Sequence, residues 1–347
     1  MSKLRQEKEI LSISRIAFLL LFAIIAFITA ILNANRPITV GKDTEVYINY
    51  YNNVQFAHDK LKFEPAFHNL ALGLNHVGAP YELFFFLIYI VIFITCCFFY
   101  YKLVGGIKVN IPLHLFALTG LFFSSSWFLV ATTNGLRQGL AIPLTWLAIL
   151  YFSKKQYVRF FVFYSLSIGF HYSAILILPG FLLLRFRDGL LYFLIIFLGV
   201  GYYVGINEEL VRLASLLLAH LFGYDLYSAI KFYGVDSGNW VGFQANLFLY
   251  SFFWLVFYYY ASYLVTEPKR LRYAWRIYCV LIFCYFVFGF GGYSNRYAMY
   301  VWLFLPIMHT IFLVWLRIDP YIKYGLAFMI FGFGISFYVA HLVGMLI

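Results

Sequence analysis

The sequence predicts an all-α polytopic membrane protein with about 11 transmembrane helices, within a range of 10–12. Three observations predict this fold class. Hydrophobic residues make up 64% of the 347 residues and charged residues only 11%, which is unlike a soluble domain of ordinary composition. Apolar runs of roughly 18 or more residues recur along the chain, and each is long enough to cross a hydrocarbon core of about 30 Å. These runs are unbroken, unlike the short alternating strands of a membrane β-barrel.

The predicted spans divide the chain from end to end. We expect them near residues 16–32, 83–101, 111–131, 137–152, 159–170, 173–184, 190–206, 246–265, 277–290, 298–316 and 324–346. The two short runs within 159–184 could instead form one broken or re-entrant unit. The first run is too long for the apolar part of a signal peptide, so we expect an uncleaved span. Residues 1–347 are expected to form a single integral membrane domain.

Basic residues indicate the orientation of the spans. The chain carries 25 Lys and Arg residues against 14 Asp and Glu residues, a net charge of +11. Basic residues favour one set of loops by about two to one, which is typical of cytoplasmic loops. This bias explains the positive charge without a nucleic acid partner, and it places the N-terminus in the cytoplasm. The long loops 34–82 and 207–245 then lie outside, where we expect them to cap an active site with short interfacial helices.

The most unusual polar residues interrupt the tract TTNGLRQGLAIPLTW, residues 132–146. Arg137 and Gln138 stand at the outer end of a span, although a charge near the bilayer centre costs at least about 2.5–3.5 kcal/mol. Three candidate helix caps precede them: Thr132, Thr133 and Asn134. An arginine opposes the dipole at a helix N-terminus. The arrangement becomes favourable if an anion binds to the arginine and to the free backbone N–H groups.

A second stretch, GGYSNRYAMY (291–300), repeats this arrangement. Arg296 opens another inward-running span, and Tyr297 follows it. Two arginines at outward-facing helix starts would suit a diphosphate group. The alternative is that both arginines reach toward lipid phosphates at the interface.

The first outer loop supplies candidate carboxylates. Asp43 lies in GKDTEVYINYY (41–51), and Glu64 precedes Pro65 in FEPAFHNLALGL (63–74). Proline is favourable at the first helical position, and apolar residues then recur at helical spacing, so an interfacial helix is expected from Pro65 onward. Glu64 is then either a simple N-cap or a general base.

Two further features lie on the same predicted side. His171, in FHYSAIL, is either a satisfied structural residue or a group that hydrogen-bonds phosphate or transfers protons. Segment 208–222 is amphipathic, with Glu208 and Arg212 one turn apart. It is either a mobile lid or a surface helix.

Several motifs are absent from the sequence. No Walker loop, GxSxG, HExxH or glycine-rich nucleotide fingerprint occurs, and the inner loops are too short for a nucleotide-sugar domain. The four cysteines lie in apolar runs without metal-ligand spacing. We therefore expect an enzyme without cofactor or metal that uses an activated lipid donor.

The order of these motifs resembles a known family. Along the chain stand Asp43 with Tyr47, EPAF (64–67), NGLRQGLA (134–141), HYSA (171–174) and the Arg296–Tyr297 pair. This order is similar to that of the EpsG-like branch of the Wzy polysaccharide polymerases. The resemblance covers most of the chain, and RQGLA and HYSA are its most specific parts. The family's glutamate motif commonly reads EPGF, whereas Ala66 stands here in place of the glycine.

The resemblance implies a glycosyltransferase of the bacterial inner membrane whose active site faces the periplasm. Such polymerases join oligosaccharide repeats carried on undecaprenyl diphosphate to build O-antigen (the polysaccharide of lipopolysaccharide) or capsule. A hydroxyl of one lipid-linked unit attacks the anomeric carbon of the growing chain, and undecaprenyl diphosphate leaves. The implied partners are the lipid-linked donor and acceptor glycans, membrane lipid and a Wzz-type chain-length regulator.

The resemblance also implies roles for the candidate site residues. We expect the diphosphate to be bound by Arg137, Gln138, Arg296, Tyr297 and Asn134. A carboxylate should deprotonate the acceptor hydroxyl, with Glu64 preferred, Asp43 second and His171 assisting. No metal is required, because arginines can neutralise the diphosphate.

Other membrane functions remain as alternatives. An O-antigen ligase would use the same arginines but transfer the glycan to lipid A core, and its loss would accumulate lipid-linked polymer rather than single repeats. An acyltransferase acting through His171 would leave Arg137 and Arg296 without a role. A flippase for lipid-linked oligosaccharides would place cations through a central cavity, whereas the unusual charges here gather on one predicted side.

Overall fold

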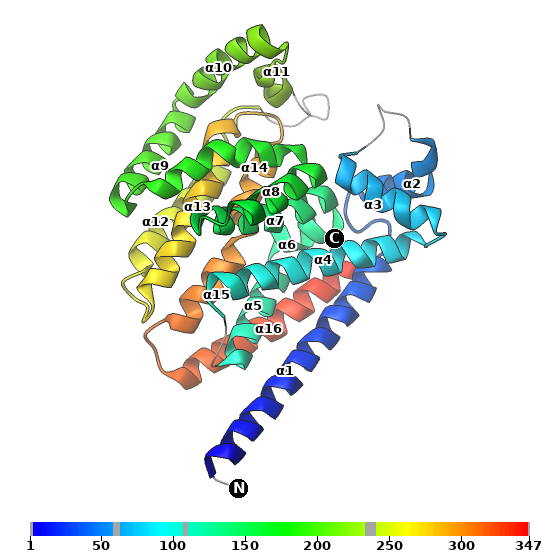
Figure 1. Cartoon of the computed structure of the whole chain (residues 1–347), viewed down its shortest axis with the longest axis vertical. Helices are drawn as coiled ribbons and strands as arrows, with labels where there is room; N and C mark the ends of the chain where they lie inside the picture. The colour runs from blue at the N-terminus through cyan, green and yellow to red at the C-terminus, as the bar shows by residue number, and fades with distance from the viewer. Residues whose placement is uncertain (1–2, 58–62, 107–109, 233–240, 346–347) are drawn as a thin grey trace. The chain divides into compact units, whose positions relative to one another are not determined.

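The computed structural model describes residues 3–57, 63–106, 110–232 and 241–345 (Figure 1). Within these ranges the chain is mostly helical and contains no β-strand. The structure therefore confirms an all-α polytopic membrane protein. Two compact units form, and each is described by itself. The first comprises Met1–Leu147, Ser165–Tyr172 and His309–Ile347, and the second comprises Ala148–Tyr164 and Ser173–Met308. The single domain expected for residues 1–347 stays a prediction.

The described part of the chain contains helices that are long and apolar enough to cross a membrane. Four qualify on their own: α4 (Tyr81–Leu103), α13 (Pro268–Phe288), the α14–α15 segment (Ser294–Trp315) and α16 (Pro320–Leu342). Two bent pairs raise the number to six if each pair is one span: α5 (Ile111–Phe123) with α6 (Ser126–Thr133), bent by 70°, and α9 (Asp188–Tyr203) with α10 (Ile206–Phe222), bent by 88°. Each predicted span overlaps helical residues, but 111–131, 190–206 and 298–316 each cross a break between two helices. The last span, 324–346, ends outside the described residues. The count of about 11 spans stays a prediction.

The remaining elements complete the two units. The first unit also holds α1 (Lys3–Ala34), α2 (Thr44–Asn52), the 3₁₀ turn η1 (Val54–Phe56) and α3 (Pro65–His76). The second also holds most of the 3₁₀ segment η3 (Tyr172–Arg185), α11 (Leu226–Lys231) and α12 (Ala245–Ala261). Both units contain parts of α7 (Leu136–Ser153), α8 (Tyr157–Phe170) and α15 (Leu305–Trp315).

Close helix contacts and buried hydrogen bonds hold the first unit together. A Cβ atom on Gly334 of α16 would lie 2.2 Å from the carbonyl oxygen of Gly120 on α5, so these helices touch backbone to backbone, as small residues allow in membranes. The hydroxyl of Tyr338 on α16 bonds to Thr132 of α6 at 2.8 Å and to Asn33 of α1 at 3.2 Å. One buried phenol thus joins three helices without leaving a polar group unsatisfied.

Helix α13 forms the core of the second unit, where it packs against α9, α12 and α14. Its Tyr278 donates to the Ser251 carbonyl at 2.8 Å, and its Trp275 donates to the Leu255 carbonyl at 3.0 Å. Trp302 of α14 donates to the Ser251 hydroxyl at 2.8 Å. Large aromatic side chains therefore fill this core, and the polar atoms of Trp275, Tyr278 and Trp302 are paired.

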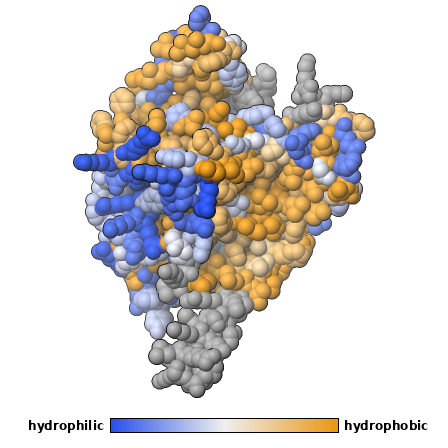
Figure 2. Space-filling model, viewed as in Figure 1, coloured by the Kyte–Doolittle hydropathy of each residue, from blue (hydrophilic) through white to orange (hydrophobic). Residues whose placement is uncertain are grey.

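The surface carries many large apolar side chains, as expected for a protein that contacts lipid. Figure 2 shows hydrophobic residues over wide areas of the visible face. Leu20 of α1, Phe193 of α9 and Phe328 of α16 are each more than half exposed. Water would disfavour apolar patches of this extent on a monomeric soluble protein.

Candidate active site

The junction between α6 and α7 positions Arg137. Helix α6 ends at Thr133, and α7 begins at Leu136, so Arg137 lies in the first turn of α7, as predicted. A Cβ atom on Gly139 would lie 2.2 Å from the carbonyl oxygen of Ala131. Glycine at position 139 therefore lets the start of α7 lie directly against α6.

The three candidate caps before α7 do not cap it, which corrects the sequence prediction. The hydroxyls of Thr132 and Thr133 donate to carbonyls one turn back in α6, at Phe128 and Leu129. A threonine inside a helix satisfies its hydroxyl in this way. The side-chain oxygen of Asn134 instead accepts the backbone N–H of Asp43 at 2.8 Å. Asn134 thus ties the start of α2 to the α6–α7 junction.

Glu64 connects two of the other predicted site residues. It occupies the N-cap position of α3, which begins at Pro65 as predicted, but its side chain makes no capping hydrogen bond. Oε2 of Glu64 accepts from Nη1 of Arg137 at 2.6 Å, and Oε1 lies 2.7 Å from Nδ1 of His171. The Glu64 carboxylate is buried. Of the two roles left open for Glu64, the simple N-cap is therefore excluded.

A break between two helical segments positions His171. Helix α8 ends at Phe170, and η3 begins at Tyr172. The hydroxyl of Ser167, one turn before His171, donates to the Ala141 carbonyl of α7 at 2.8 Å. A Cβ atom on Gly169 would lie 3.1 Å from the Cβ atom of Ala66, so the end of α8 also touches the first turn of α3. These contacts bring His171 to Glu64.

Aromatic side chains enclose the Arg137 guanidinium. Its carbon atom lies 4.2 Å from the centre of the Phe63 ring, a distance at which a cation is attracted to the ring face. Tyr47 packs against Phe63 and Phe67 at ring separations of 5.9 and 5.7 Å. Such a setting has a low local dielectric, which strengthens the charge interactions of Arg137.

The charge state of Glu64 follows from its neighbours. Burial raises the pKa of the carboxyl group, but the hydrogen bond with His171 and the positive charge of Arg137 outweigh burial and lower it to about 2. Glu64 is therefore ionised at neutral pH and acts only as an acceptor. His171 must then donate from Nδ1, and in the neutral form of the ring the lone pair is on Nε2.

Arg137 does not use all of its donors on Glu64. Its Nη1 makes the 2.6 Å contact, whereas its Nε is buried and has no hydrogen-bond partner among the described residues. Buried donors are nearly always paired in folded proteins. An orphaned donor beside a carboxylate therefore suggests a ligand atom that completes the site.

Arg36 is a buried residue that the sequence analysis did not single out. Its Nη1 donates to the Asn33 carbonyl at 2.7 Å and its Nη2 to the Thr133 carbonyl at 3.2 Å. Burial lowers the pKa of Arg36 to about 10. These carbonyls lie in the last turns of α1 and α6, where a cation is favoured by the helix dipole. Its position directly after a long apolar run is the signal that could have identified it.

A cavity of about 310 Å³ borders the same junction. It is lined by Thr39, Val40, Gly41, Lys42, Leu129, Val130, Thr133, Asn134 and His341. Asp43 adjoins this cavity at the N-cap of α2 and is joined to Asn134 through its backbone, not its carboxylate. The described contacts therefore do not link the Asp43 carboxylate to Glu64 or Arg137.

Two predicted site residues belong to the second unit. Arg296 lies in the first turn of α14 (Ser294–Trp302), in agreement with the predicted helix start, and its guanidinium stacks 4.1 Å from the Tyr293 ring centre. Tyr297 is largely buried. Gln138 belongs to the first unit, where it is buried next to Arg137 in the sequence. The structure thus brings Glu64, Arg137 and His171 into contact within the first unit. Arg296 and Tyr297 belong to the second unit.

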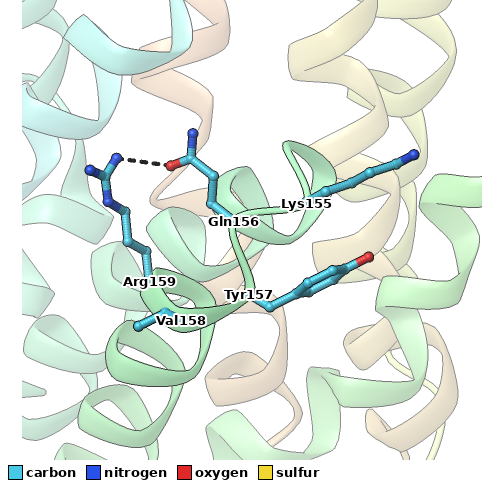
Figure 3. A pocket seen from close by; sticks show the side chains of 5 residues that line it. All are labelled: Lys155, Gln156, Tyr157, Val158 and Arg159. Carbon is cyan, nitrogen blue, oxygen red and sulfur yellow. Dashed lines mark hydrogen bonds between the residues drawn. The ribbon is translucent and has the colours of Figure 1, made fainter.

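A second hollow, of about 480 Å³, lies in the second unit at the turn between α7 and α8. Figure 3 shows that Gln156 and Arg159 point to one side, where they share a 2.9 Å hydrogen bond, whereas Lys155 and Tyr157 point to another. Polar groups that diverge in this way do not form a convergent binding site.

No group of three or more His, Cys, Asp and Glu side chains within the described ranges could hold a metal ion. Cys96, Cys279 and Cys284 are free and buried, and Cys97 is free and partly buried. The candidate site is therefore the set formed by Glu64, Arg137 and His171.

These observations define a class: a helical membrane protein in which a buried carboxylate pairs with an arginine and a histidine at the ends of helices. A family model described as the EpsG family matches residues 19–345. The chain belongs to the EpsG family, a Wzy-like polymerase family, which supports a polysaccharide polymerase in general. No curated protein and no solved structure matches the chain.

Proposed function

We propose that this polymerase joins oligosaccharide repeats carried on undecaprenyl diphosphate, at the periplasmic face of the bacterial inner membrane. In this reaction a hydroxyl oxygen of the acceptor glycan forms a bond to the anomeric carbon of the donor glycan. The bond from that carbon to the diphosphate breaks, and undecaprenyl diphosphate leaves with the electron pair. The hydroxyl proton passes to a base in the protein.

The partly buried, partly unsatisfied guanidinium of Arg137 is the observation that carries this proposal. Only Nη1 is engaged by Glu64, and Nε is buried without a partner in the described part of the chain. A guanidinium presents several donors in a fixed plane and matches the oxygens of a phosphate group. A diphosphate gains charge as it leaves, so donors aimed at it lower the barrier to transfer.

His171 is the base in this proposal, and Glu64 orients it. The sequence reasoning preferred Glu64, but a carboxyl group whose pKa lies at about 2 holds a proton too weakly to be an effective base near neutral pH. The 2.7 Å contact with Glu64 fixes a proton on Nδ1 of His171. Nε2 can then accept the hydroxyl proton, and Glu64 stabilises the imidazolium that forms.

The remaining predicted residues have supporting roles in the proposal. Arg296 supplies the second positive charge for the diphosphate, with Tyr297, Gln138 and Asn134 assisting. Asp43 stays the second candidate carboxylate. Membrane lipid surrounds the protein, and a Wzz-type regulator sets the chain length of the product.

The proposal is tested by the surface polysaccharide of cells that lack this protein. These cells should show single repeats in place of a polymer ladder on a gel. Wild type should restore the ladder, whereas Arg137→Ala and Arg137→Lys at matched expression should not. Accumulated lipid-linked polymer in the deletion strain would indicate a ligase instead, and a normal ladder would overturn the polymerase assignment.

A purified system tests the donor class directly. Protein reconstituted in lipid vesicles receives a synthetic undecaprenyl-diphosphate repeat, and free undecaprenyl diphosphate is measured together with glycan length. Both should rise in parallel, because each new linkage releases one lipid diphosphate. Polymer formation from a soluble nucleotide sugar would overturn the proposed donor.

A further inference from the structure

Helix α9 of the second unit has charged groups at both ends. Asp188 at its first position bonds to Arg276 of α13, and Glu208 and Glu209 follow shortly after its end. Its 16 residues rise about 24 Å, close to the thickness of a hydrocarbon core of about 30 Å. Since charged groups avoid that core, the two ends of α9 suit opposite membrane surfaces.

The chain turns sharply after α9, and the turn is rigidly built. Helix α10 runs at 88° to α9. Gly205 adopts φ +83°, a conformation that glycine reaches without strain. The side-chain nitrogen of Asn207 donates to the carbonyls of Leu198 and Phe286, each at 2.8 Å. A Cβ atom on Gly201 would lie 2.4 Å from the Asn207 side-chain oxygen. Glycine at position 201 therefore leaves room for the Asn207 side chain and its two hydrogen bonds.

Helix α10 has three distinct faces. One is buried against the protein: Asn207, Val211 and Ser215. The second is apolar and between 50% and 60% exposed: Ile206, Leu210, Leu213, Leu217 and Leu221. These five residues recur at intervals of three and four, which places them in one stripe. The third is a mixed flank. On it Arg212 bonds to Glu209 through Nε and Nη2, at 2.9 and 2.7 Å, and Leu216 is exposed.

Helix α11 fixes α10 in this orientation. Glu208 accepts from Lys231 at 2.8 Å and from the Tyr227 hydroxyl at 2.9 Å. Ser215 donates to Asp225 at 2.9 Å. These bonds hold the inner side of α10, so the apolar stripe faces outward from the second unit.

We propose that α10 lies in the plane of the membrane surface, with its apolar stripe inserted among the lipid acyl chains of one leaflet. A helix at right angles to a spanning helix runs parallel to the surface. Its charged flank excludes it from the hydrocarbon core, and an exposed leucine stripe beside a charged flank is the pattern of an interfacial helix. The occupant of the stripe is the bilayer, because α9 delivers α10 to the level of the lipid headgroups.

Of the two roles left open for segment 208–222, this placement favours the surface helix over the mobile lid. It adds that the helix is fixed by α11 and that its leucine stripe enters one leaflet. The inference rests on the fold and on these contacts, and it holds whether or not the proposed polymerase reaction is correct.

Fluorescence quenching in lipid nanodiscs tests the inference on the full-length protein. Leu213→Cys and Leu217→Cys carry an environment-sensitive probe on the stripe, and Glu209→Cys carries it on the mixed flank of the same helix. The unsubstituted chain is the control for background labelling. Its own cysteines are buried or partly buried and should react little with the probe. Quenchers are nitroxide groups on the upper acyl chains of the lipid and iodide in the water.

Both stripe positions should lose fluorescence to the nitroxide lipid and resist iodide, and position 209 should do the opposite. Two different stripe positions guard against one variant that fails to fold. Equal quenching by iodide at positions 213 and 209 would overturn the inference. Resistance to both quenchers, together with disulfide cross-links between copies through position 213, would also overturn it, because a second copy would then cover the stripe.

Discussion

Glu64 and His171 stand 107 positions apart in the sequence, yet Oε1 of Glu64 and Nδ1 of His171 lie 2.7 Å apart. The same carboxylate holds Arg137 through its other oxygen, at 2.6 Å. One buried anion therefore orients both a candidate base and a candidate anion-binding cation. Both His171 and Arg137 are held by Glu64, so the loss of this carboxylate should disturb the base and the anion-binding group together.

Replacing Glu64 with glutamine should reduce polymer formation strongly. The amide has nearly the same shape but no charge, so it no longer stabilises the imidazolium of His171. General-base catalysis contributes about 10²–10⁴-fold in rate, and we expect a loss within that range. The measurement is the initial rate of undecaprenyl diphosphate release at saturating donor by purified protein. Glu267→Gln is the matched control, because Glu267 forms an exposed ion pair with Arg270. A Glu64→Gln rate near that of wild type would contradict the assigned role.

Replacing Arg137 with lysine should also fail to support polymerisation. Lysine keeps the charge but lacks the planar set of donors, so it cannot hold Glu64 and a phosphate oxygen in the same geometry. Removing one donor that stabilises a developing anion costs about 10²–10³-fold in turnover. The control is Arg270→Lys, at an exposed position. If Arg137→Lys retains full turnover, then charge alone suffices and the planar donor arrangement is not used.

Local features of the site could be predicted from the sequence, because single residue types determine them. Pro65 predicted the start of α3, and the polar tract before Arg137 predicted the start of α7. His171 was expected beyond the first short helix, and it follows Phe170 at the end of α8. In each case a proline or a run of polar residues marks the boundary of a helix.

The contacts between these features could not be predicted. Whether Glu64 meets Arg137 or His171 depends on how α3, α7 and α8 pack, and close approaches at Gly139 and Gly169 decide that packing. The partner of Asn134 is a backbone N–H 91 positions away. Arg36 escaped notice because a buried arginine held by carbonyl groups has no carboxylate partner to mark it in the sequence. Local patterns contain no information on such long-range pairings.

The ionised state of Glu64 predicts a specific dependence of stability on pH. Its pKa falls from 4.5 to about 2 on folding, so its stabilising effect is present above pH 4.5 and is lost as the pH falls toward 2. A shift of this size corresponds to roughly 3 kcal/mol. Wild type should therefore exceed Glu64→Gln in melting temperature at pH 7, and the difference should shrink below pH 4.5. Thermal unfolding in detergent at a series of pH values measures it. A difference that is constant across this range would show that the Glu64 charge does not stabilise the fold.

Two glycines of the first unit should respond in opposite ways to alanine. A methyl group on Gly139 would lie 2.2 Å from the Ala131 carbonyl oxygen, whereas one on Gly73 of α3 would meet nothing within 4 Å. Gly139→Ala should destabilise the fold by about 1–3 kcal/mol, because α6 and α7 must move apart. Gly73→Ala should stabilise α3 by about 0.5–1 kcal/mol, because alanine has the higher helix propensity. Melting temperatures of the two purified variants give the comparison, and equal effects would show that the α6–α7 contact is not close.

Gly169 and Ala66 should behave as a compensating pair. Ala66 replaces the glycine that the related EPGF motif carries, and Gly169 supplies the space that the Ala66 methyl group needs, at 3.1 Å. Gly169→Ala alone should push the start of α3 from the end of α8 and weaken the Glu64–His171 contact, which lowers polymerase activity. Adding Ala66→Gly should restore most of the activity, because one methyl group between the two backbones is tolerated and two are not. Activities of wild type, both single variants and the double variant form a complete cycle. Additive losses in the double variant would mean that this contact does not set the spacing of the catalytic pair.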